Sequence, residues 1–283
     1  MSLPRLISGF HEIADDYNAI LCDVWGVLHN GYDPFIGADL ALAQFRQNGG
    51  KVLLLSNAPR PGTTVTAGLD EIGVSREAYD DILTSGDVAR TLLADRGQQG
   101  QTCHHIGPTK DADLIAGIDI QFTGIDQADF ILLSGMRDDT VETPKDYMKA
   151  MDIWHSRKLQ LLCANPDRQV QFGDRVIYCA GAVAEIYEQN GGDVVWLGKP
   201  YQPVYERARA LLNAMLDSIP RILAIGDGPK TDIPGAQRAG IDALFISGGL
   251  AGAVQNLDTA EQIGAVLDAE NTHALAAIRH LVW

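Results

Sequence analysis

The chain has 283 residues, of which 46% are hydrophobic and 21% charged, and it carries a formal net charge of −15 with a pI of about 4.7. This composition is typical of a soluble globular protein with one large or two modest domains, and the negative charge disfavours nucleic acid and anionic membranes as partners. A phosphorylated substrate would also be repelled, so a phosphate site would need local positive charge or a metal ion.

The cysteines and the N-terminal segment predict a cytoplasmic protein. Four cysteines are scattered without CxxC spacing, and three of them lie in apolar runs, which indicates reduced core residues. The segment MSLPRLISGF lacks the long apolar stretch of a signal peptide, and no run of about 18 apolar residues is present that would span a membrane.

Apolar runs that predict strands alternate with segments that predict helices. The first predicted elements are a strand at 19–24, a helix at 38–47, a strand at 51–56, a helix at 63–72, a strand at 81–83 and a helix at 88–96. Strands at 101–106, 129–133 and 159–163 follow, with helices at 109–117, 144–157 and 180–190. The last predicted elements are strands at 194–197, 221–225 and 242–246 and helices at 203–216, 232–239, 259–269 and 272–281. This alternation favours an α/β protein with doubly wound, Rossmann-like parallel sheets.

Loops that carry chemistry follow three predicted strands, after Val24, Leu55 and Ile225, and none of them lies in the middle of the chain. The middle looks like a self-contained α/β insertion with turn residues on both sides. We therefore expect a split core formed by 1–84 and 195–283, with an inserted α/β cap at 85–194.

Polar side chains at strand ends form the first half of a candidate site. Asp23 ends an apolar strand, where open α/β sheets bind ligands, and a carboxylate there can act as a nucleophile or a Mg²⁺ ligand. Ser56 and Asn57 end the strand at 51–56, where a hydroxyl and backbone N–H groups can bind a phosphoryl oxygen.

Two further elements complete the candidate site. Lys199, in the segment LGKP, can neutralise phosphate as a point charge. Asp227 and Asp232 lie in a glycine-rich loop after the strand at 221–225 and form a plausible Mg²⁺ site.

The ordered set resembles the haloacid dehalogenase superfamily of aspartyl-nucleophile phosphatases over almost the whole chain. The long insertion between SNAPR (56–60) and LGKP (197–200) resembles the class IIA, NagD-like subgroup, as do LTSG (83–86), CANPD (163–167) and GAVAEIYE (181–188). The resemblance implies that Asp23 attacks phosphorus, Ser56 binds the phosphoryl group and Lys199 neutralises its charge. The metal ligands that it implies for Mg²⁺ are Asp23, the backbone carbonyl of Trp25, Asp227 and, directly or through an oriented water, Asp232.

The sequence departs from the family at one position. The family pattern is Asp-x-Asp, and its second Asp protonates the leaving group and then activates water, but here that position is Trp25, which cannot exchange a proton usefully. Because acid–base catalysis contributes about 10²–10⁴-fold, its loss predicts slow turnover or a restriction to good leaving groups. His29 could substitute or could be a packing residue, and Trp25 itself could pack or could cover the phosphate.

The insertion offers candidate substrate contacts. Asn165, Asp167 and Arg168 follow an apolar strand and could bind substrate, although Asn-Pro-Asp is equally a turn sequence. Arg60 could add positive charge at the phosphate site or lie in solvent, and the His104-His105 pair reads as strand residues rather than metal ligands.

Three functions compete. We expect a Mg²⁺-dependent phosphatase that hydrolyses a small phosphorylated metabolite through an aspartyl-phosphate. The alternatives are an impaired member that binds a phosphometabolite, or a hydrolase of acyl phosphates or phosphonates, which need no general acid. The resemblance also implies that the core is the hydrolase domain and that the inserted cap selects the substrate. By analogy with the subgroup, whose inserted cap often dimerises, the protein could also form a homodimer.

Overall fold

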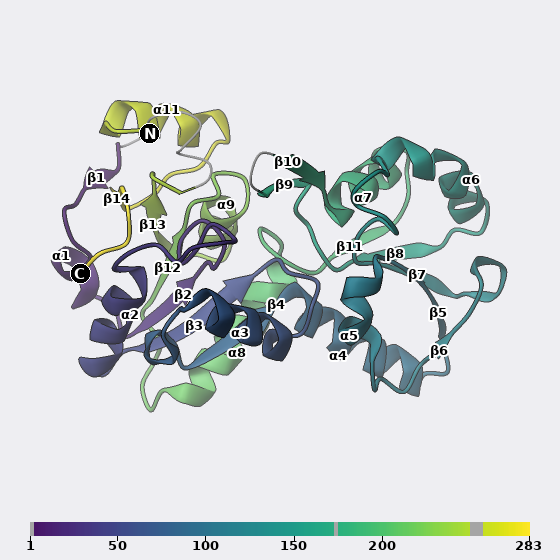
Figure 1. Cartoon of the computed structure of the whole chain (residues 1–283), viewed down its shortest axis with the longest axis horizontal. Coiled ribbons are helices and arrows are strands. Elements are labelled where there is room, and N and C mark those ends of the chain that lie inside the picture. The colour runs from purple at the N-terminus through teal and green to yellow at the C-terminus, as the bar shows by residue number, and fades with distance from the viewer. Residues whose placement is uncertain (1–2, 173–174, 250–256) are drawn as a thin grey trace. The chain divides into compact units, whose positions relative to one another are not determined.

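The computed structural model describes residues 3–172, 175–249 and 257–283 (Figure 1). The chain forms two compact units. The first comprises the described parts of Met1–Ser56, Thr66–Leu83 and Tyr205–Trp283, and the second comprises those of Asn57–Val65 and Thr84–Val204. The segments 57–65 and 195–204 thus group with the second unit, whereas we predicted them in the core. The assignment of hydrolase core and substrate-selecting cap stays a prediction.

The first unit is built on a seven-stranded sheet with the strand order β1-β14-β13-β12-β2-β3-β4 (Figure 1). Its strands are β1 (Arg5–Leu6), β2 (Ala19–Cys22), β3 (Lys51–Ser56), β4 (Asp81–Thr84), β12 (Ile222–Gly226), β13 (Asp242–Ile246) and β14 (Ala276–Ile278). The described pairings in this sheet are parallel. Every residue of β2 and β12 is buried, which explains why their sequences are continuous apolar runs rather than alternating ones.

The order of the strands reverses between β2 and β12. The chain proceeds from β2 to β3 and β4 on one side, whereas β12, β13 and β14 extend the sheet on the other. The register places Cys22 beside Ile225, so both strands end at the same edge. In open α/β sheets, ligands bind at such a reversal, outside the carboxyl ends of the strands.

The helices of the first unit follow its strands, as the alternation predicts. They are α1 (His11–Ala14), α2 (Ala38–Gln47), α3 (Gly62–Ile72), α8 (Gln202–Met215), α9 (Asp232–Arg238) and α11 (Ala260–Ala269), with a 3₁₀ turn at Arg76–Ala78; α3 and α8 begin in the second unit. In α2, the buried residues Ala38, Ala41, Leu42 and Phe45 recur at intervals of three or four, and the helix packs with this apolar side.

The second unit contains a five-stranded parallel sheet with the order β11-β8-β7-β5-β6 and a separate antiparallel hairpin. The strands are β5 (Thr102–Ile106), β6 (Gln121–Phe122), β7 (Phe130–Leu133), β8 (Gln160–Cys163), β9 (Gln169–Phe172), β10 (Arg175–Tyr178) and β11 (Val194–Trp196). The helices are α4 (Ser85–Gln98), α5 (Ala112–Ile115), α6 (Met148–Ser156) and α7 (Ala180–Gln189), with 3₁₀ turns at Thr109–Asp111, Ile125–Gln127 and Pro144–Tyr147. Trp154 of α6 and Tyr187 of α7 meet edge to face with ring centroids 5.5 Å apart, inside the main apolar cluster of this unit.

Several predicted helices differ from the structure, and those at 109–117 and 144–157 begin with 3₁₀ turns. The segment 272–281, rich in helix formers, contains strand β14 instead, because the buried Ala276–Ile278 pairs with β13 and β1 and burial outweighs helix propensity. Helix α4 begins at Ser85 rather than Val88, since Thr84 and Asp87 form a capping box. It also continues past Gly97 to Gln98.

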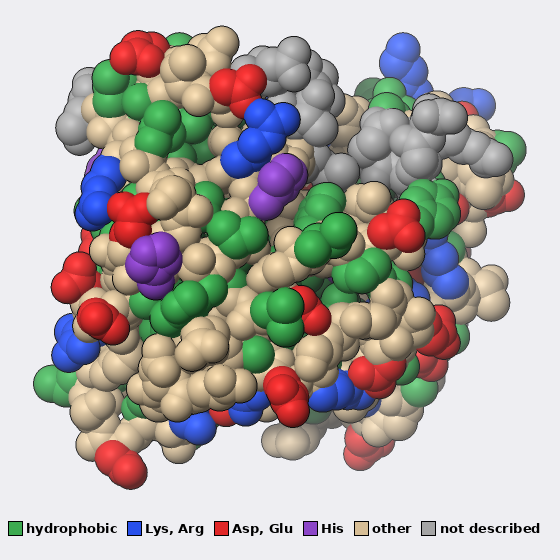
Figure 2. Space-filling view, turned by 60° about the vertical axis from the view of Figure 1, so that its left-hand side comes forward, with side chains coloured by type: hydrophobic (Ala, Val, Ile, Leu, Met, Phe, Trp, Pro, Cys, Tyr) green, Lys and Arg blue, Asp and Glu red, His purple; other side chains and the backbone are tan. Residues whose placement is uncertain are grey.

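Within the described residues, no helix is long and apolar enough to cross a membrane. The four cysteines are free and buried, as predicted, and burial raises the pKa of Cys103 to about 12. On the face drawn in Figure 2, Asp and Glu side chains are dispersed among polar and hydrophobic ones, in agreement with the net negative charge.

Candidate active site

Three aspartates of the first unit meet at the reversal point of the sheet. Asp23 follows β2, Asp227 follows β12 and Asp232 is the first residue of α9; each contributes one carboxylate oxygen, and these oxygens lie within 4.8 Å of one another. Their side chains are nearly withdrawn from solvent, with 8%, 6% and 5% exposure respectively. The predicted proximity of these carboxylates is therefore a feature of the structure.

Backbone geometry holds the cluster together. The N–H of Asp23 donates to the carbonyl of Ile225 at 2.8 Å, which ties the end of β2 to β12. The N–H of Gly228 donates to Oδ2 of Asp232 at 3.0 Å and fixes that carboxylate at the start of α9. Gly26 has a φ of +92°, and a Cβ there would stand 2.2 Å from Oδ2 of Asp227, so the loop requires glycine for both conformation and space.

The chemistry of this donor set fits a hard divalent cation. A cation shared by three carboxylates this close together offsets the repulsion between their charges. All three offer oxygen, which Mg²⁺ prefers, and Mg²⁺ usually keeps several waters beside one or two protein carboxylates. Asp23 and Asp227 fit as direct ligands, and Asp232, already bound by Gly228, fits as a further ligand or as an acceptor for a metal-bound water.

Ser56 ends β3, the neighbour of β2 on the side away from β12, and it is 8% exposed. The register pairs Cys22 with Leu54, so Ser56 lies beyond the paired residues at the edge of the sheet that carries Asp23. The sequence thus identified the correct edge for the serine.

Trp25 and His29 pack against each other in the loop after β2. Their ring centroids are 5.3 Å apart in an edge-to-face arrangement. A Cβ at Gly31 would lie 2.6 Å from Cη2 of Trp25, so the indole rests directly on the backbone of this glycine. Trp25 is half-buried, and the packing that we weighed for it is present.

His29 is poorly suited to replace the missing aspartate. It is 5% exposed, and its Nδ1 accepts the N–H of Gly31 at 2.9 Å, which requires that nitrogen to be unprotonated. Burial lowers the pKa of His29 to about 4. The imidazole is therefore neutral at pH 7 and cannot supply a proton to a leaving group efficiently.

Lys199 and Asn57 lie in the second unit and contact each other there. Oδ1 of Asn57 accepts the N–H of Lys199 at 2.7 Å, and Nδ2 of Asn57 donates to the carbonyl of Lys199 at 3.1 Å. Nδ2 also donates to Oδ1 of Asp167 at 2.9 Å. The side-chain amide of Asn57 is thus occupied by protein groups, and the predicted phosphate binding at Ser56 and Asn57 through backbone N–H groups stays a prediction.

The other predicted substrate contacts also take part in local structure, and their binding of substrate stays a prediction. Oδ1 of Asn165 accepts the N–H of Asp167 at 3.2 Å, which is the turn that we kept as an alternative. Arg168 forms a two-point ion pair with Glu185 of α7. Arg60 is half-buried; burial raises the pKa of Asp111, and the nearby charge of Arg60 opposes that rise.

The histidine pair lies on β5, as predicted. Nδ1 of His104 bonds the carbonyl of Thr123 at 2.9 Å, and Nε2 of His105 bonds the hydroxyl of Ser134 at 3.0 Å. Sequence reasoning missed Ser85, whose hydroxyl reaches the carbonyls of Asn57, Ala58 and Ala164. The only signal for it was its place directly after β4 in the LTSG segment.

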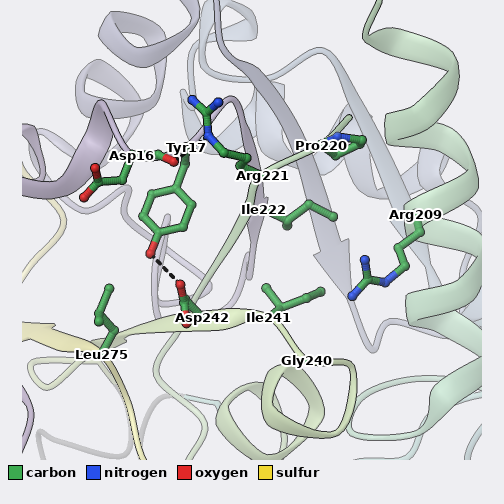
Figure 3. Close-up of a pocket in the computed structure, with 10 residues that line it drawn as sticks. All are labelled: Asp16, Tyr17, Arg209, Pro220, Arg221, Ile222, Gly240, Ile241, Asp242 and Leu275. Atoms are coloured by element: carbon green, nitrogen blue, oxygen red, sulfur yellow. Dashed lines mark hydrogen bonds between the residues drawn. The ribbon is translucent and has the colours of Figure 1, made fainter. Parts of the chain in front are cut away.

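A cavity of about 550 Å³ opens in the first unit where several strands begin, at the edge opposite the aspartate cluster (Figure 3). Its lining includes Tyr17, Arg209, Arg221 and Asp242, and the hydroxyl of Tyr17 donates to Oδ2 of Asp242 at 2.9 Å. None of the predicted site residues lines it. Within the first unit, the three aspartates and Ser56 therefore lie away from this cavity, at the carboxyl edge of the sheet.

The fold and this cluster define a class: a doubly wound α/β protein with an acidic, metal-compatible site at the reversal point of its sheet. Residues 20–121 match the family of haloacid dehalogenase-like hydrolases, and residues 196–269 match a second, HAD-hydrolase-like family. A hydrolase of the haloacid dehalogenase-like family from Brucella suis 1330 is 39% identical, with a TM-score of 0.86 and coverage of 98% of this chain and 100% of that one. The chain belongs to the haloacid dehalogenase-like hydrolase family.

More distant relatives carry functional descriptions. The D-glycerol 3-phosphate phosphatase of Mycobacterium tuberculosis is 25% identical over 246 residues, which cover 84% of this chain and 65% of that protein, so the chain spans about two thirds of this relative. A structure of the glycerol phosphate phosphatase from that organism in complex with magnesium has a TM-score of 0.66 at 25% identity, over 84% of this chain and 70% of that one. A possible sugar phosphatase from Cytophaga hutchinsonii shares the fold, with a TM-score of 0.79 at 19% identity over 98% of each chain.

Proposed function

We propose that this protein is a Mg²⁺-dependent phosphatase that hydrolyses a small phosphorylated metabolite through an aspartyl-phosphate on Asp23. The observation that carries the proposal is the meeting of Asp23, Asp227 and Asp232 within 4.8 Å at the reversal point of the sheet. Family membership and the phosphatase descriptions of relatives support it.

In the proposed reaction, a carboxylate oxygen of Asp23 attacks phosphorus while the bond from phosphorus to the ester oxygen breaks. Water then attacks the phosphorus of the aspartyl-phosphate, which releases inorganic phosphate and restores the Asp23 carboxylate. Ser56 donates a hydrogen bond to the phosphoryl group, Lys199 balances its charge, and Arg60 adds positive charge near it. Asp23, Asp227, the carbonyl of Trp25 and Asp232 would hold Mg²⁺, which would supply positive charge to offset the repulsion between the carboxylate and the phosphate.

The leaving group must depart without a strong acid beside it, since Trp25 and a neutral His29 donate protons poorly. The best substrates should therefore be phosphates whose leaving oxygen is weakly basic, such as aryl phosphate esters or acyl phosphates. The name of the mycobacterial relative makes glycerol 3-phosphate the natural test of a poor leaving group.

The test is phosphate release with Mg²⁺ from 4-nitrophenyl phosphate, acetyl phosphate and glycerol 3-phosphate, with Asp23→Asn as the inactive control. We expect turnover by the parent protein, a loss of at least about 10³-fold in Asp23→Asn, and rates that fall as the leaving group becomes more basic. Equal rates of phosphate release by the parent protein and Asp23→Asn would refute the assignment of Asp23 as the nucleophile.

The packing of Trp25 on His29 and Gly31 favours a second candidate, a member that binds a phosphometabolite with little turnover. It predicts thermal stabilisation by phosphorylated ligands in the presence of Mg²⁺ without release of phosphate. Rapid hydrolysis of any of the three esters would exclude it. The cytoplasmic location and the homodimer remain predictions, which fractionation and light scattering would test.

A further inference from the structure

The geometry points to Asn57 as a positioning residue that sets the orientation of Lys199 through the backbone of that lysine. The inference rests on the proposed function, because it matters for catalysis only if Lys199 neutralises phosphate. It gives the side chain of Asn57 a role distinct from the phosphate binding that the sequence predicted for the backbone N–H groups beside Ser56.

The first observation is that Asn57 binds both polar backbone groups of Lys199. Its Oδ1 accepts the lysine N–H at 2.7 Å, and its Nδ2 donates to the lysine carbonyl at 3.1 Å. Such a pair of bonds fixes the peptide groups on both sides of one Cα, and hence the direction in which its side chain leaves the backbone. Asn57 and Lys199 are 6% and 3% exposed, so water competes little for these bonds.

The second observation is that the hydrogen-bonding capacity of the amide is nearly exhausted. The two N–H groups of a side-chain amide have one acceptor each here, the carbonyl of Lys199 and Oδ1 of Asp167 at 2.9 Å. The amide oxygen accepts the N–H of Lys199 and lies so close to Gly198 that a Cβ there would stand 2.4 Å from it. A phosphate could bind this amide only by displacing the bond to Lys199 or the bond to Asp167.

The third observation is that the partner of Asn57 is itself fixed. The N–H of Asp167 is held by Oδ1 of Asn165 at 3.2 Å, and a Cβ at Gly198 would also stand 2.9 Å from Cδ of Pro166. The loop 164–167 therefore packs on the backbone that carries Lys199. Asn57 joins this loop to Lys199. Gly198 permits this packing because a side chain there would clash with Asn57 and Pro166.

The experiment is a double-mutant cycle with Asn57→Ala, Lys199→Ala and the combined variant. If Asn57 acts through Lys199, Asn57→Ala lowers kcat/KM for 4-nitrophenyl phosphate by about 10- to 100-fold, because small misplacements of catalytic groups cost that much. The combined variant should then be no worse than Lys199→Ala alone. Asn190→Ala is the matched control; it removes a side-chain bond from the same unit, Nδ2 to the carbonyl of Ile186 at 2.9 Å, and should leave kcat/KM unchanged.

The second measurement is the affinity of each variant for inorganic phosphate with Mg²⁺, by calorimetry, together with its thermal midpoint. Multiplying losses in the combined variant would mean that Asn57 is merely structural and would overturn the inference while leaving the phosphatase standing. If the parent protein releases no phosphate, the proposed function fails. The coupling between Asn57 and Lys199 can then still be measured from the affinities of the four proteins for inorganic phosphate. Non-additive losses there support the positioning role, and additive losses or no phosphate binding by the parent refute it.

Discussion

Gly26 lies so close to Asp227 that a methyl group on it would meet the carboxylate at 2.2 Å. The contact joins the loop after β2 to the loop after β12. It depends on a φ of +92° at Gly26, a backbone conformation that favours glycine. The absence of a side chain at Gly26 thus sets the spacing between the loop after β2 and the loop after β12. A substitution that adds a side chain at Gly26 tests this role.

Gly26→Ala should abolish the thermal stabilisation by Mg²⁺, because the added methyl group displaces Asp227. Gly49→Ala is the matched control, since Gly49 has a similar φ of +94° but nothing within 4 Å of its ideal Cβ. Both substitutions should destabilise the fold by about 1–2 kcal/mol through the left-handed backbone conformation. Calorimetric scans with and without Mg²⁺ separate the two effects, and an unaltered response to Mg²⁺ in Gly26→Ala would argue against the predicted metal position.

Asp227→Asn should affect stability in opposite directions with and without metal. Without Mg²⁺ the variant should melt at a higher temperature than the parent, because it removes one of three mutually repelling buried carboxylates. At Mg²⁺ one hundred times above the Kd, the parent should gain about 2.7 kcal/mol, and the variant should gain much less. Asp152→Asn, on an exposed position of α6, should change the stability neither with nor without Mg²⁺. A parent protein whose stability does not change on addition of Mg²⁺ would contradict the assignment of the aspartates as metal ligands.

Trp25→Asp restores the carboxylate of the family pattern and should raise turnover of glycerol 3-phosphate by up to about 10²–10⁴-fold. It should change the rate on 4-nitrophenyl phosphate little, since nitrophenolate leaves without help. Trp25→Phe keeps an aromatic ring against Gly31 and supplies no proton, so it should produce no gain. If Trp25→Asp also produces none, the missing acid does not limit the reaction.

The stability of the second unit should fall in mild acid because of His105. Burial and the nearby charge of His104 lower the pKa of His105 from its ordinary value of 6.5 to about 4. Between these values the unfolded chain binds a proton that the folded chain excludes, so stability is full above pH 6.5 and declines as the pH falls toward 4. In chemical denaturation at pH 7.5 and 5, His105→Gln should lose less stability than the parent. An identical loss in both proteins would assign the acid sensitivity to other groups.

The sequence predicted those features that depend on local pattern. The bounds of α2, β3 and β13 agree with the prediction because each has an unbroken periodicity or apolar run with clear ends. Asp23 and Asp227 could be assigned to one edge because parallel strands end together. What failed was decided by distant contacts: β14 is a strand only because β13 and β1 flank it, and the hairpin of β9 and β10 gave no clear signal.

Side-chain partners were the least predictable part of the site. Asn57 followed a strand as a phosphate ligand would, but its amide is taken by Lys199 and Asp167, which are remote in sequence. Nothing in the sequence shows that His29 is buried enough to lose its charge. Both outcomes depend on what packs around the group, and a residue's neighbours in sequence do not contain that information.

The adjacency of β2 and β12 has a consequence for the making of this protein. Asp23 emerges early in synthesis, but the strand that completes its surroundings follows the whole second unit. A growing chain therefore holds Asp23, the proposed nucleophile, for most of its synthesis without Asp227 and Asp232, and in the proposed enzyme such a chain cannot bind metal or react. Activity would appear at one late moment, when β12 and α9 have left the ribosome and β12 has docked beside β2.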